Sequence, residues 1–329
     1  MTTVSACLIV KDEAQNLPRC LASLQGVVDE IIVVDTGSTD DSCRIAESFG
    51  ARVHLFAWRN DFSAARNAAL EQASGDWILS LDADEELEEN SRGQLLRELV
   101  SSARADGFYL TVRNLQPPGE LTPWLDMQIL RLFRHLPGVV FEGAIHEQVT
   151  PSLLRAGGNI QTGSLILLHY GYQLKEAQGK SRAHRNLELL QEALKITPDD
   201  PYLQYQLGAT LKSLNLNEEA RTVLEKALMR ASDLSADVLA GTYMRLAQIY
   251  LMDDAFDSVM KNALACLHIE PDNIPALYAA ALASYSLGKK KEAYTFFERL
   301  AARPEISEQD LSNIRQVMAS IQTDFHVDS

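Results

Sequence analysis

The fold is decided by Gly75-Asp76-Trp77-Ile78-Leu79-Ser80-Leu81-Asp82-Ala83-Asp84, where an apolar segment runs directly into two carboxylates. The apolar residues Trp77–Leu81 predict a short, buried strand. Two carboxylates one residue apart can hold a hard cation and leave coordination positions open for phosphate oxygens. In isolation, however, Asp82-Ala83-Asp84 is more typical of a solvated acidic loop, because glutamates occupy four of the next five positions. The meaning of the motif therefore depends on the residues around it.

Strand and helix patterns alternate upstream of this stretch. The sequence predicts strands at Val4–Val10, Glu30–Val34 and Arg52–Phe56, and helices at Asn16–Leu24, from Thr39/Asp40 to Ser48, and at Ser63–Ala73. Thr39 or Asp40 is expected to cap the second helix, and Gly50 and Gly75 are expected to end the second and third helices. Strands separated by single helices predict a parallel sheet with right-handed crossovers.

Polar residues gather at the predicted carboxyl ends of these strands, the edge at which open α/β sheets bind ligands. They are Val10-Lys11-Asp12-Glu13, Asp35 and the Asp82–Asp84 motif. The chain contains neither a G-x-G-x-x-G nor a Walker A pattern, which argues against a dinucleotide site and a P-loop. The three segments therefore predict a ligand site of another kind.

From Asp106 to Tyr172 the pattern changes to strand-like segments divided by turns. The segments are Phe108–Arg113, Gln128–Phe133 and Ser164–Tyr170, and the turns are Pro117-Pro118-Gly119, Pro137-Gly138 and Gly157-Gly158. We expect antiparallel additions to the same domain, with loops in the usual place for residues that contact an acceptor.

After about Leu174 the chain becomes helical and repeats itself. The clearest unit contains Leu207-Gly208, Leu211, Ala220, Leu224 and Ala227, and related positions are Leu246-Ala247, Tyr250, Cys266 and Pro271, then Gly288, Ala293 and Phe297, and, upstream, Leu190, Ala193 and Pro198. Small residues at these offsets allow paired helices to approach closely, which is typical of tetratricopeptide repeats. Val259 and Ser284 depart from the consensus, and one repeat carries extra residues. We therefore predict an α/β domain over residues 1–175 and a tetratricopeptide-like helical domain over residues 176–329.

Composition restricts the function further. Of the 329 residues 46% are hydrophobic and 23% are charged, and the formal net charge is −15 at pH 7. This charge repels nucleic acid and anionic lipid, and it would repel a nucleotide diphosphate that lacked a divalent cation or local arginines. No stretch reaches the roughly 18 apolar residues that span a bilayer, and residues 1–10 read as a strand, not as a signal peptide. We expect a cytoplasmic protein whose cysteines are reduced thiols and not zinc ligands: Cys7, Cys20, Cys43 and Cys266.

Two further segments carry candidate binding residues. Asp35 ends its strand before Thr36-Gly37-Ser38, where its carboxylate can accept a hydrogen bond from the imide N–H of uracil and Gly37 lets the backbone approach a ligand. A role in the turn accounts for the same residues equally well. Arg66 lies in the first turn of the helix that Asp61 opens, and it can reach a base or a phosphate. A surface ion pair is an equally good interpretation of Arg66.

Three later residues are candidates for catalysis or metal binding. His146 and Glu147 follow a strand-like segment, and either can deprotonate an acceptor hydroxyl, amine or thiol. His169 ends the apolar strand Leu165–His169, where it can complete a metal shell or contact a diphosphate. Without further context, a His-Glu pair is more often incidental and a lone histidine more often structural.

Taken together, these segments resemble a family 2 glycosyltransferase of the GT-A fold. The resemblance is nearly continuous from Ser5 to about Asp84 and rests on residues 8–13, 29–40, 61–67 and 75–85. The later segments 131–134, 143–147 and 169–172, followed by helical repeats, are similar to bacterial members that carry tetratricopeptides. These members include the bacteriocin peptide S-glycosyltransferases.

The resemblance implies an inverting transfer from a nucleotide-sugar, usually a UDP-sugar, with Mg²⁺ or Mn²⁺. It implies a protein, peptide or glycan acceptor, which the repeats help to hold. By position in the family's motifs, the expected contacts are Glu13 and Asp35 at the uridine, Arg66 near the base, Asp82 near the ribose or metal, Asp84 on the metal, and His169 on the metal or diphosphate. Glu147 is the expected base, with His146 as the second choice, although the family's clear Glu-Asp base motif is absent.

Two other functions remain open at this point. One is a scaffold or binding protein, in which the repeats recruit a partner and the nucleotide-sugar site is degenerate; the set Asp35, Arg66, Asp82 and Asp84 argues against it. The other is a sugar-phosphate nucleotidyltransferase, whose Gly-rich N-terminal loop is missing. The Q-x-x-R-W signature of processive polysaccharide synthases is also missing. The sequence leaves open the sugar, the acceptor, the linked atom and the oligomeric state, a homo-oligomer included.

Overall fold

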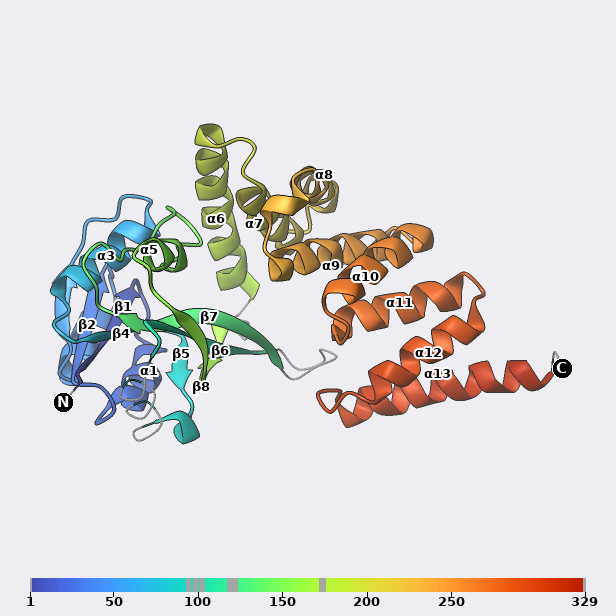
Figure 1. The fold of residues 1–329 in the computed structure, drawn as a ribbon, viewed down its shortest axis with the longest axis horizontal. Coiled ribbons are helices and arrows are strands. Elements are labelled where there is room, and N and C mark those ends of the chain that lie inside the picture. Colours follow the sequence, from blue (N-terminus) through green and yellow to red (C-terminus); the bar gives the residue numbers. More distant parts are fainter. Residues whose placement is uncertain are drawn as a thin grey trace. The chain divides into compact units, whose positions relative to one another are not determined.

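The computed structural model describes residues 2–92, 96, 100, 104–116, 124–171 and 176–327. The chain folds into two compact units. The first contains the described residues up to 171 and is an α/β domain, and the second contains those from 176 onward and is helical (Figure 1). The predicted turn Pro117-Pro118-Gly119, like Tyr172, lies outside the described residues.

The described residues of the first unit form an eight-stranded sheet in the order β3-β2-β1-β4-β7-β6-β8-β5. The strands are β1 (Val4–Val10), β2 (Glu30–Asp35), β3 (Arg52–Leu55), β4 (Trp77–Asp82), β5 (Glu85–Leu87), β6 (Gly107–Leu115), β7 (Trp124–Arg134) and β8 (Ile160–His169). The first four strands pair in parallel, as the sequence predicts, and β7 joins β4 in antiparallel orientation.

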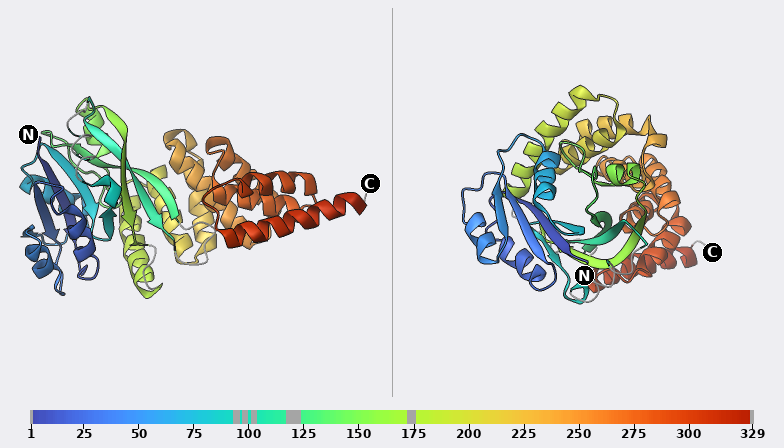
Figure 2. Two further views of the ribbon diagram at one scale, coloured as in Figure 1. Left: turned by 90° about the horizontal axis from the view of Figure 1, so that it is seen from below. Right: turned by 60° about the vertical axis from the view of Figure 1, so that its left-hand side comes forward.

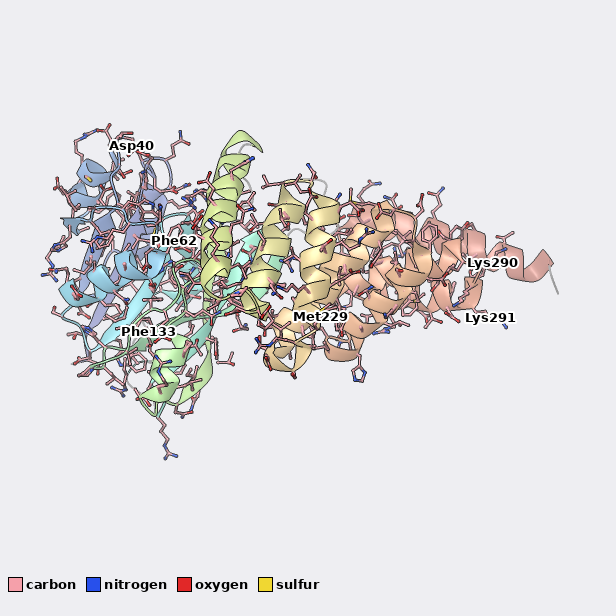
Figure 3. The ribbon with its side chains drawn as sticks, turned by 90° about the horizontal axis from the view of Figure 1, so that it is seen from above. Asp40, Phe62, Phe133, Met229, Lys290 and Lys291 are labelled. Carbon is pink, nitrogen blue, oxygen red and sulfur yellow. The ribbon has the colours of Figure 1, made fainter. Side chains whose placement is uncertain are left out.

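Helices cover both faces of the parallel half of the sheet (Figure 1). On one face α1 (Leu17–Leu24) and α2 (Ser42–Ser48) pack with β1 residues such as Leu8; on the other, α3 (Phe62–Gln72) and α5 (Thr150–Arg155) pack with Cys7. Because side chains alternate along a strand, β1 supplies both apolar clusters. This double burial explains why β1 is a nearly continuous apolar run. Phe62, at the start of α3, and Phe133, on β7, are labelled in Figure 3.

Two glycines that were expected to end helices have different roles. Gly50 follows α2 with a φ of +79°, the left-handed conformation that commonly ends a helix. Gly75 lies beyond the end of α3 at Gln72, and a Cβ there would come 2.5 Å from Ser5 Oγ and 2.7 Å from Ser5 N. Gly75 is therefore required where the chain passes close to β1, and it does not end the helix.

The later strands differ from the expected antiparallel additions. β6 and β7 are antiparallel, as predicted, but β8 pairs in parallel with β6. The short strand β5 lies in the glutamate-rich run that, taken in isolation, is typical of a solvated loop, yet it pairs antiparallel with β8 at the sheet edge. Pairing opposite β8 explains how a run rich in glutamate can fold into the sheet, since Glu85 turns inward and Glu86 stays partly exposed.

The second unit is a succession of helices, each of which packs against the next (Figure 2). They are α6 (Glu176–Ile196), α7 (Pro201–Ser213), α8 (Asn217–Leu228), α9 (Ala236–Met252), α10 (Phe256–Ile269), α11 (Ile274–Ser286), α12 (Lys290–Ala301) and α13 (Glu308–Val327). At Gly208 a Cβ would lie 2.5 Å from Leu224 Cγ, so glycine allows α7 and α8 to pack closely. Ala220 and Ala227, from the predicted repeat positions, are likewise completely buried.

The expectations about the cysteines and about membrane-spanning segments apply to both units. All four cysteines are free thiols; three are buried and Cys43 is half-buried. Within the described part of the chain, no helix combines the length and the apolar character needed to cross a bilayer.

Candidate active site

The candidate site lies where the parallel strands end. In the sheet register Val10 pairs with Asp35, and Ile9 pairs with Asp82. The residues that follow β1, β2 and β4 therefore emerge side by side at one edge, as the alternation of strands and helices predicts.

The loops after β1 and β2 are bound to each other. Asp12 has a φ of +54°, and its Oδ1 accepts a hydrogen bond of 2.7 Å from the N–H of Thr39. Asp40 accepts hydrogen bonds from the N–H of Ala14 (3.0 Å) and from that of Ser42 (2.9 Å). The side chain of Asp40 thus binds the N–H at the start of α2, although the N-cap residue itself is Asp41, without a side-chain cap. These contacts fix the shape of the edge on which a ligand would lie.

Glu13 and Asp35, the two expected uridine contacts, both lie in this region. Glu13 Oε2 accepts a hydrogen bond of 2.7 Å from Asn16 Nδ2. Asp35 is buried, and its carboxylate accepts from the N–H groups of Gly37 (3.1 Å) and Ser38 (3.0 Å). Gly37 takes a φ of +107°, which makes this tight turn possible. Each carboxylate oxygen can accept more than one hydrogen bond, so the turn holds Asp35 in place without exhausting its capacity.

Arg66 is the centre of a buried charge network. Its Nε donates to Glu147 Oε1 (2.5 Å), its Nη2 to Asp82 Oδ1 (2.5 Å) and its Nη1 to Ser80 Oγ (3.1 Å). The network joins the start of α3, the end of β4 and the segment after β7. Only 7% of the Arg66 side chain is exposed, so this is a buried ion pair and not the surface pair that the sequence left open.

A second arginine, Arg131 on β7, completes the network. Its Nη2 donates to Asp82 Oδ2 (2.7 Å) and to Glu85 Oε1 (2.6 Å), and both Arg131 and Glu85 are buried. Burial opposes the ionisation of Asp82, but the charges of Arg131 and Arg66 outweigh it and hold the pKa of Asp82 below its usual value. For Glu85 burial is the stronger effect, and it raises the pKa of that carboxyl despite the contact with Arg131.

His146 and Glu147 lie on a loop that is attached to α3. The N–H of Phe62 donates to the carbonyl of Ala144 (2.8 Å), and the side chain of Asn67 bonds both the N–H and the carbonyl of Phe141. His146 has a φ of +53°, a left-handed conformation that residues with a Cβ seldom adopt. The loop therefore directs Glu147 towards Arg66, and it keeps His146 next to Glu147 on a constrained backbone.

Asp84 and His169 face each other across the β4–β5 turn. Asp84 Oδ1 lies 3.6 Å from His169 Nε2, and the carbonyl of Asp84 accepts from the N–H of Tyr170 (3.0 Å). At Gly171 an added Cβ would lie 2.5 Å from His169 Nε2 and 2.9 Å from Asp84 Oδ2. Gly171 therefore packs closely against one oxygen and one nitrogen, and a larger residue at this position would push Asp84 and His169 aside.

This arrangement fits a divalent cation that takes few protein ligands. Mg²⁺ is commonly held by one or two carboxylates together with phosphate oxygens and water. Mn²⁺ also prefers oxygen ligands, so an imidazole nitrogen would be a minority ligand in its site. Among the residues that the structure describes, no three His, Cys, Asp or Glu side chains converge as a metal cluster. Asp84 and His169 would supply at most two ligands to such a cation, and a diphosphate and water would have to supply the others.

Sequence reasoning missed three residues of this site. Arg131 was noted only within a similar segment, Glu85 only as part of an acidic run, and Asn114 not at all. Asn114 Oδ1 lies 2.7 Å from His169 Nδ1. The burial of Glu85 and the position of Asn114 both depend on how β5 and β6 pair with β8, which no local pattern reveals. For Arg131 one local signal was available: a charged residue inside an apolar strand pattern indicates a buried partner of opposite charge.

Comparison with known proteins finds, over part of the chain, the family that the sequence resembles. Residues 5–145 match the model of glycosyl transferase family 2, and residues 201–234 match a tetratricopeptide repeat model. The chain therefore contains a family 2 glycosyltransferase domain followed by a tetratricopeptide region, as its sequence predicts.

Individual relatives match this chain over only part of their own length. A TPR repeat-containing protein of Synechococcus elongatus is 39% identical over 64% of this chain and 53% of its own length. Glycosyltransferase SunS of Bacillus phage SPbeta is 31% identical over 69% of this chain and 53% of its own length. The chain thus spans about half the length of these curated relatives. The crystal structure of S. aureus TarS 1-349 is 13% identical, with a TM-score of 0.42, over 82% of this chain and 92% of that one.

Proposed function

We propose that this protein is an inverting, metal-dependent glycosyltransferase that uses a nucleotide-sugar, most simply a UDP-sugar, as donor. The family of the first domain supports transfer from a nucleotide-sugar. The acceptor class is a protein, peptide or glycan, which the tetratricopeptide region helps to hold. A cytoplasmic location stays a prediction from the sequence.

The charge of the site is the observation that carries the proposal. Arg66 and Arg131 bring two positive charges, whereas Asp82, Asp84, Glu85 and Glu147 bring four negative ones when ionised, which leaves the site at −2 with His169 neutral. Both arginines are already paired with carboxylates. A diphosphate would be repelled by this site, and a divalent cation between Asp84 and His169 removes the repulsion.

Each group then has a separate task. When bound, Mg²⁺ or Mn²⁺ would neutralise charge on the leaving diphosphate. Asp84 and His169 would hold the cation, and Glu13 and Asp35 would bind the uridine. Asp82, fixed between two arginines, is a rigid acceptor for a ribose hydroxyl. Because both arginines point at Asp82, its position does not depend on the donor.

Glu147 is the base in this proposal. Its Oε1 is held by Arg66 Nε, so Oε2 is the oxygen that can take a proton from the acceptor. The acceptor atom attacks the anomeric carbon, the bond from that carbon to the diphosphate oxygen breaks in line, and the proton passes to Glu147. A single displacement of this kind inverts the anomeric configuration. The ion pair with Arg66 holds Glu147 in one orientation for this step.

The proposal is tested by donor turnover. UDP-sugars are incubated with the full chain and Mn²⁺, and release of UDP is measured for the wild type and for Asp84→Ala. We expect metal-dependent release that falls by at least about 100-fold in the variant. No binding of UDP, and no metal-dependent release across a broad panel of donors and acceptors, would reject the enzyme and favour the scaffold function.

The base is tested separately. Glu147→Gln keeps an acceptor for Arg66 Nε but cannot take the proton, so kcat should fall about 10²- to 10⁴-fold while donor binding changes little. His146→Gln is the matched control on the same loop. If His146→Gln loses more activity than Glu147→Gln, the assignment of the base is wrong.

A further inference from the structure

Asn114, on β6, lies next to His169 in the sheet. Asn114 is buried, and its Oδ1 lies 2.7 Å from Nδ1 of His169. The two residues are 55 positions apart in the chain, but the parallel pairing of β6 with β8 sets Asn114 directly opposite His169. Residues opposite each other in a sheet point to the same face, so the contact follows from the register.

The orientation of the Asn114 amide is fixed by a second contact. Its Nδ2 lies 3.5 Å from the carbonyl of Val112, on the donor side of the group. If the amide were reversed, its oxygen would face that carbonyl oxygen, and its NH₂ would face His169. The contacts therefore make Oδ1 the atom that accepts from Nδ1–H of His169.

A proton held on Nδ1 leaves Nε2 as the nitrogen with the free electron pair. Nε2 is the atom that faces Asp84 Oδ1, at 3.6 Å, and Gly171 packs closely against both side chains. An imidazole whose Nδ1–H is held by a neighbouring oxygen is both fixed in its ring orientation and restricted to the tautomer that binds metal through Nε2.

We propose that Asn114 is a positioning residue that sets the tautomer and the ring plane of His169 for binding a divalent cation. This inference rests on the proposed function, because it takes Asp84 and His169 as the groups that hold the cation. Asn114 itself touches neither the cation nor the substrate.

The experiment uses Mn²⁺ in the presence of UDP and the full chain. Mn²⁺ affinity is measured by calorimetry, and electron spin echo modulation reports whether a nitrogen is bonded to the Mn²⁺. Asn114→Leu keeps the size of the side chain but removes the acceptor. We expect its Mn²⁺ affinity to fall about 10- to 100-fold, and its nitrogen modulation to be lost at saturating Mn²⁺. Asn114→Asp restores an acceptor for Nδ1–H and should keep both within about threefold of the wild type. If the leucine variant does not fold, Asn114→Ala takes its place.

A matched control separates positioning from burial. Asn262 on α10 is also buried, and its Nδ2 donates to the carbonyl of Ser258 (2.9 Å). Asn262→Leu should keep wild-type Mn²⁺ affinity and nitrogen modulation. The proposal is overturned if Asn114→Leu behaves as the wild type, if Asn114→Asp fails to restore binding, or if Asn262→Leu loses as much.

The result is distinguishable from failure of the proposed function. Release of UDP from donors is measured on the same preparations. A wild type that turns over donors but shows no nitrogen on Mn²⁺ would overturn the role of Asn114 and leave the transferase intact. A wild type that neither binds Mn²⁺ nor turns over donors would overturn both.

Discussion

Replacing Arg131 by methionine removes the guanidinium that lies between Asp82 and Glu85 while keeping much of its apolar length. Asp82 retains its contact with Arg66. Glu85, of which 1% is exposed, retains only the N–H of Asp82 at 2.9 Å among the hydrogen bonds described for it. The main cost is therefore an uncompensated buried carboxylate at Glu85.

Removing one partner of a buried ion pair costs about 3–5 kcal/mol, a large part of the roughly 5–15 kcal/mol that stabilise a typical domain. With a urea slope of about 2 kcal/mol per M, the unfolding midpoint should fall by about 2 M. The three tryptophans, Trp58, Trp77 and Trp124, all lie in the first unit, and Trp77 is completely buried. Tryptophan fluorescence therefore follows this unit without a signal from the helical one.

Two further variants make the measurement decisive. Arg113→Met removes a bidentate pair with Asp126 that is partly exposed, and it should cost less than about 1 kcal/mol. Adding Glu85→Gln to Arg131→Met removes the buried charge and should recover at least half of the loss. The reasoning is refuted if Arg131→Met costs no more than Arg113→Met, or if the added Glu85→Gln recovers nothing.

Three other predictions concern separate features. Gly171→Ala places a methyl group against His169 Nε2 and Asp84 Oδ2, so calorimetry should show Mn²⁺ binding with UDP weakened at least tenfold; unchanged affinity would contradict the assignment of these two side chains to the cation. Burial acts to raise the pKa of Glu30, but hydrogen bonds from two serines and the charge of a neighbouring arginine lower it overall. The ionised form of Glu30 therefore stabilises the fold at pH values above its unfolded pKa of about 4.3. This stabilisation is lost as the pH falls through the lower pKa of the folded state. The stability gap between the wild type and Glu30→Gln should therefore be largest near pH 7 and narrow below about pH 4.3, and a gap independent of pH would refute the argument. Cys43 is the one thiol that is not buried, so a thiol reagent at pH 8 should modify one cysteine in the folded chain and four after unfolding; a second fast-reacting thiol would contradict the described packing.

The parts of the fold that follow from local pattern could be predicted from the sequence. β1 was predicted with its observed bounds, and β2, β3 and β4 within one residue at either end. β1, β2 and β4 are compact apolar runs next to a turn. Asp35, Asp82 and Asp84 could be placed at one edge for the same reason. In a parallel sheet, knowing where strands end is enough to know which residues meet.

The parts that depend on long-range pairing could not be predicted. β5 has almost no apolar pattern, and its burial arises from its position opposite β8 and its packing against α1. Arg131 meets Asp82 across 49 residues, and Asn114 meets His169 across 55. These contacts require the register of strands that are distant in sequence, which composition and periodicity do not contain.

The two aspartates of the Asp82-Ala83-Asp84 motif have opposite consequences for how mutants are read. Asp82 balances two buried arginines, so a loss-of-function phenotype at this position reports on folding as much as on donor binding. Asp84 faces His169, and its removal leaves both arginines paired with carboxylates. In evolution Asp82, Arg66 and Arg131 are expected to change together or not at all. Position 84, in contrast, is expected to be constrained only by binding of the donor. Sequences that keep Asp82, Arg66 and Arg131 but lack Asp84 would thus retain the fold of a transferase without its activity.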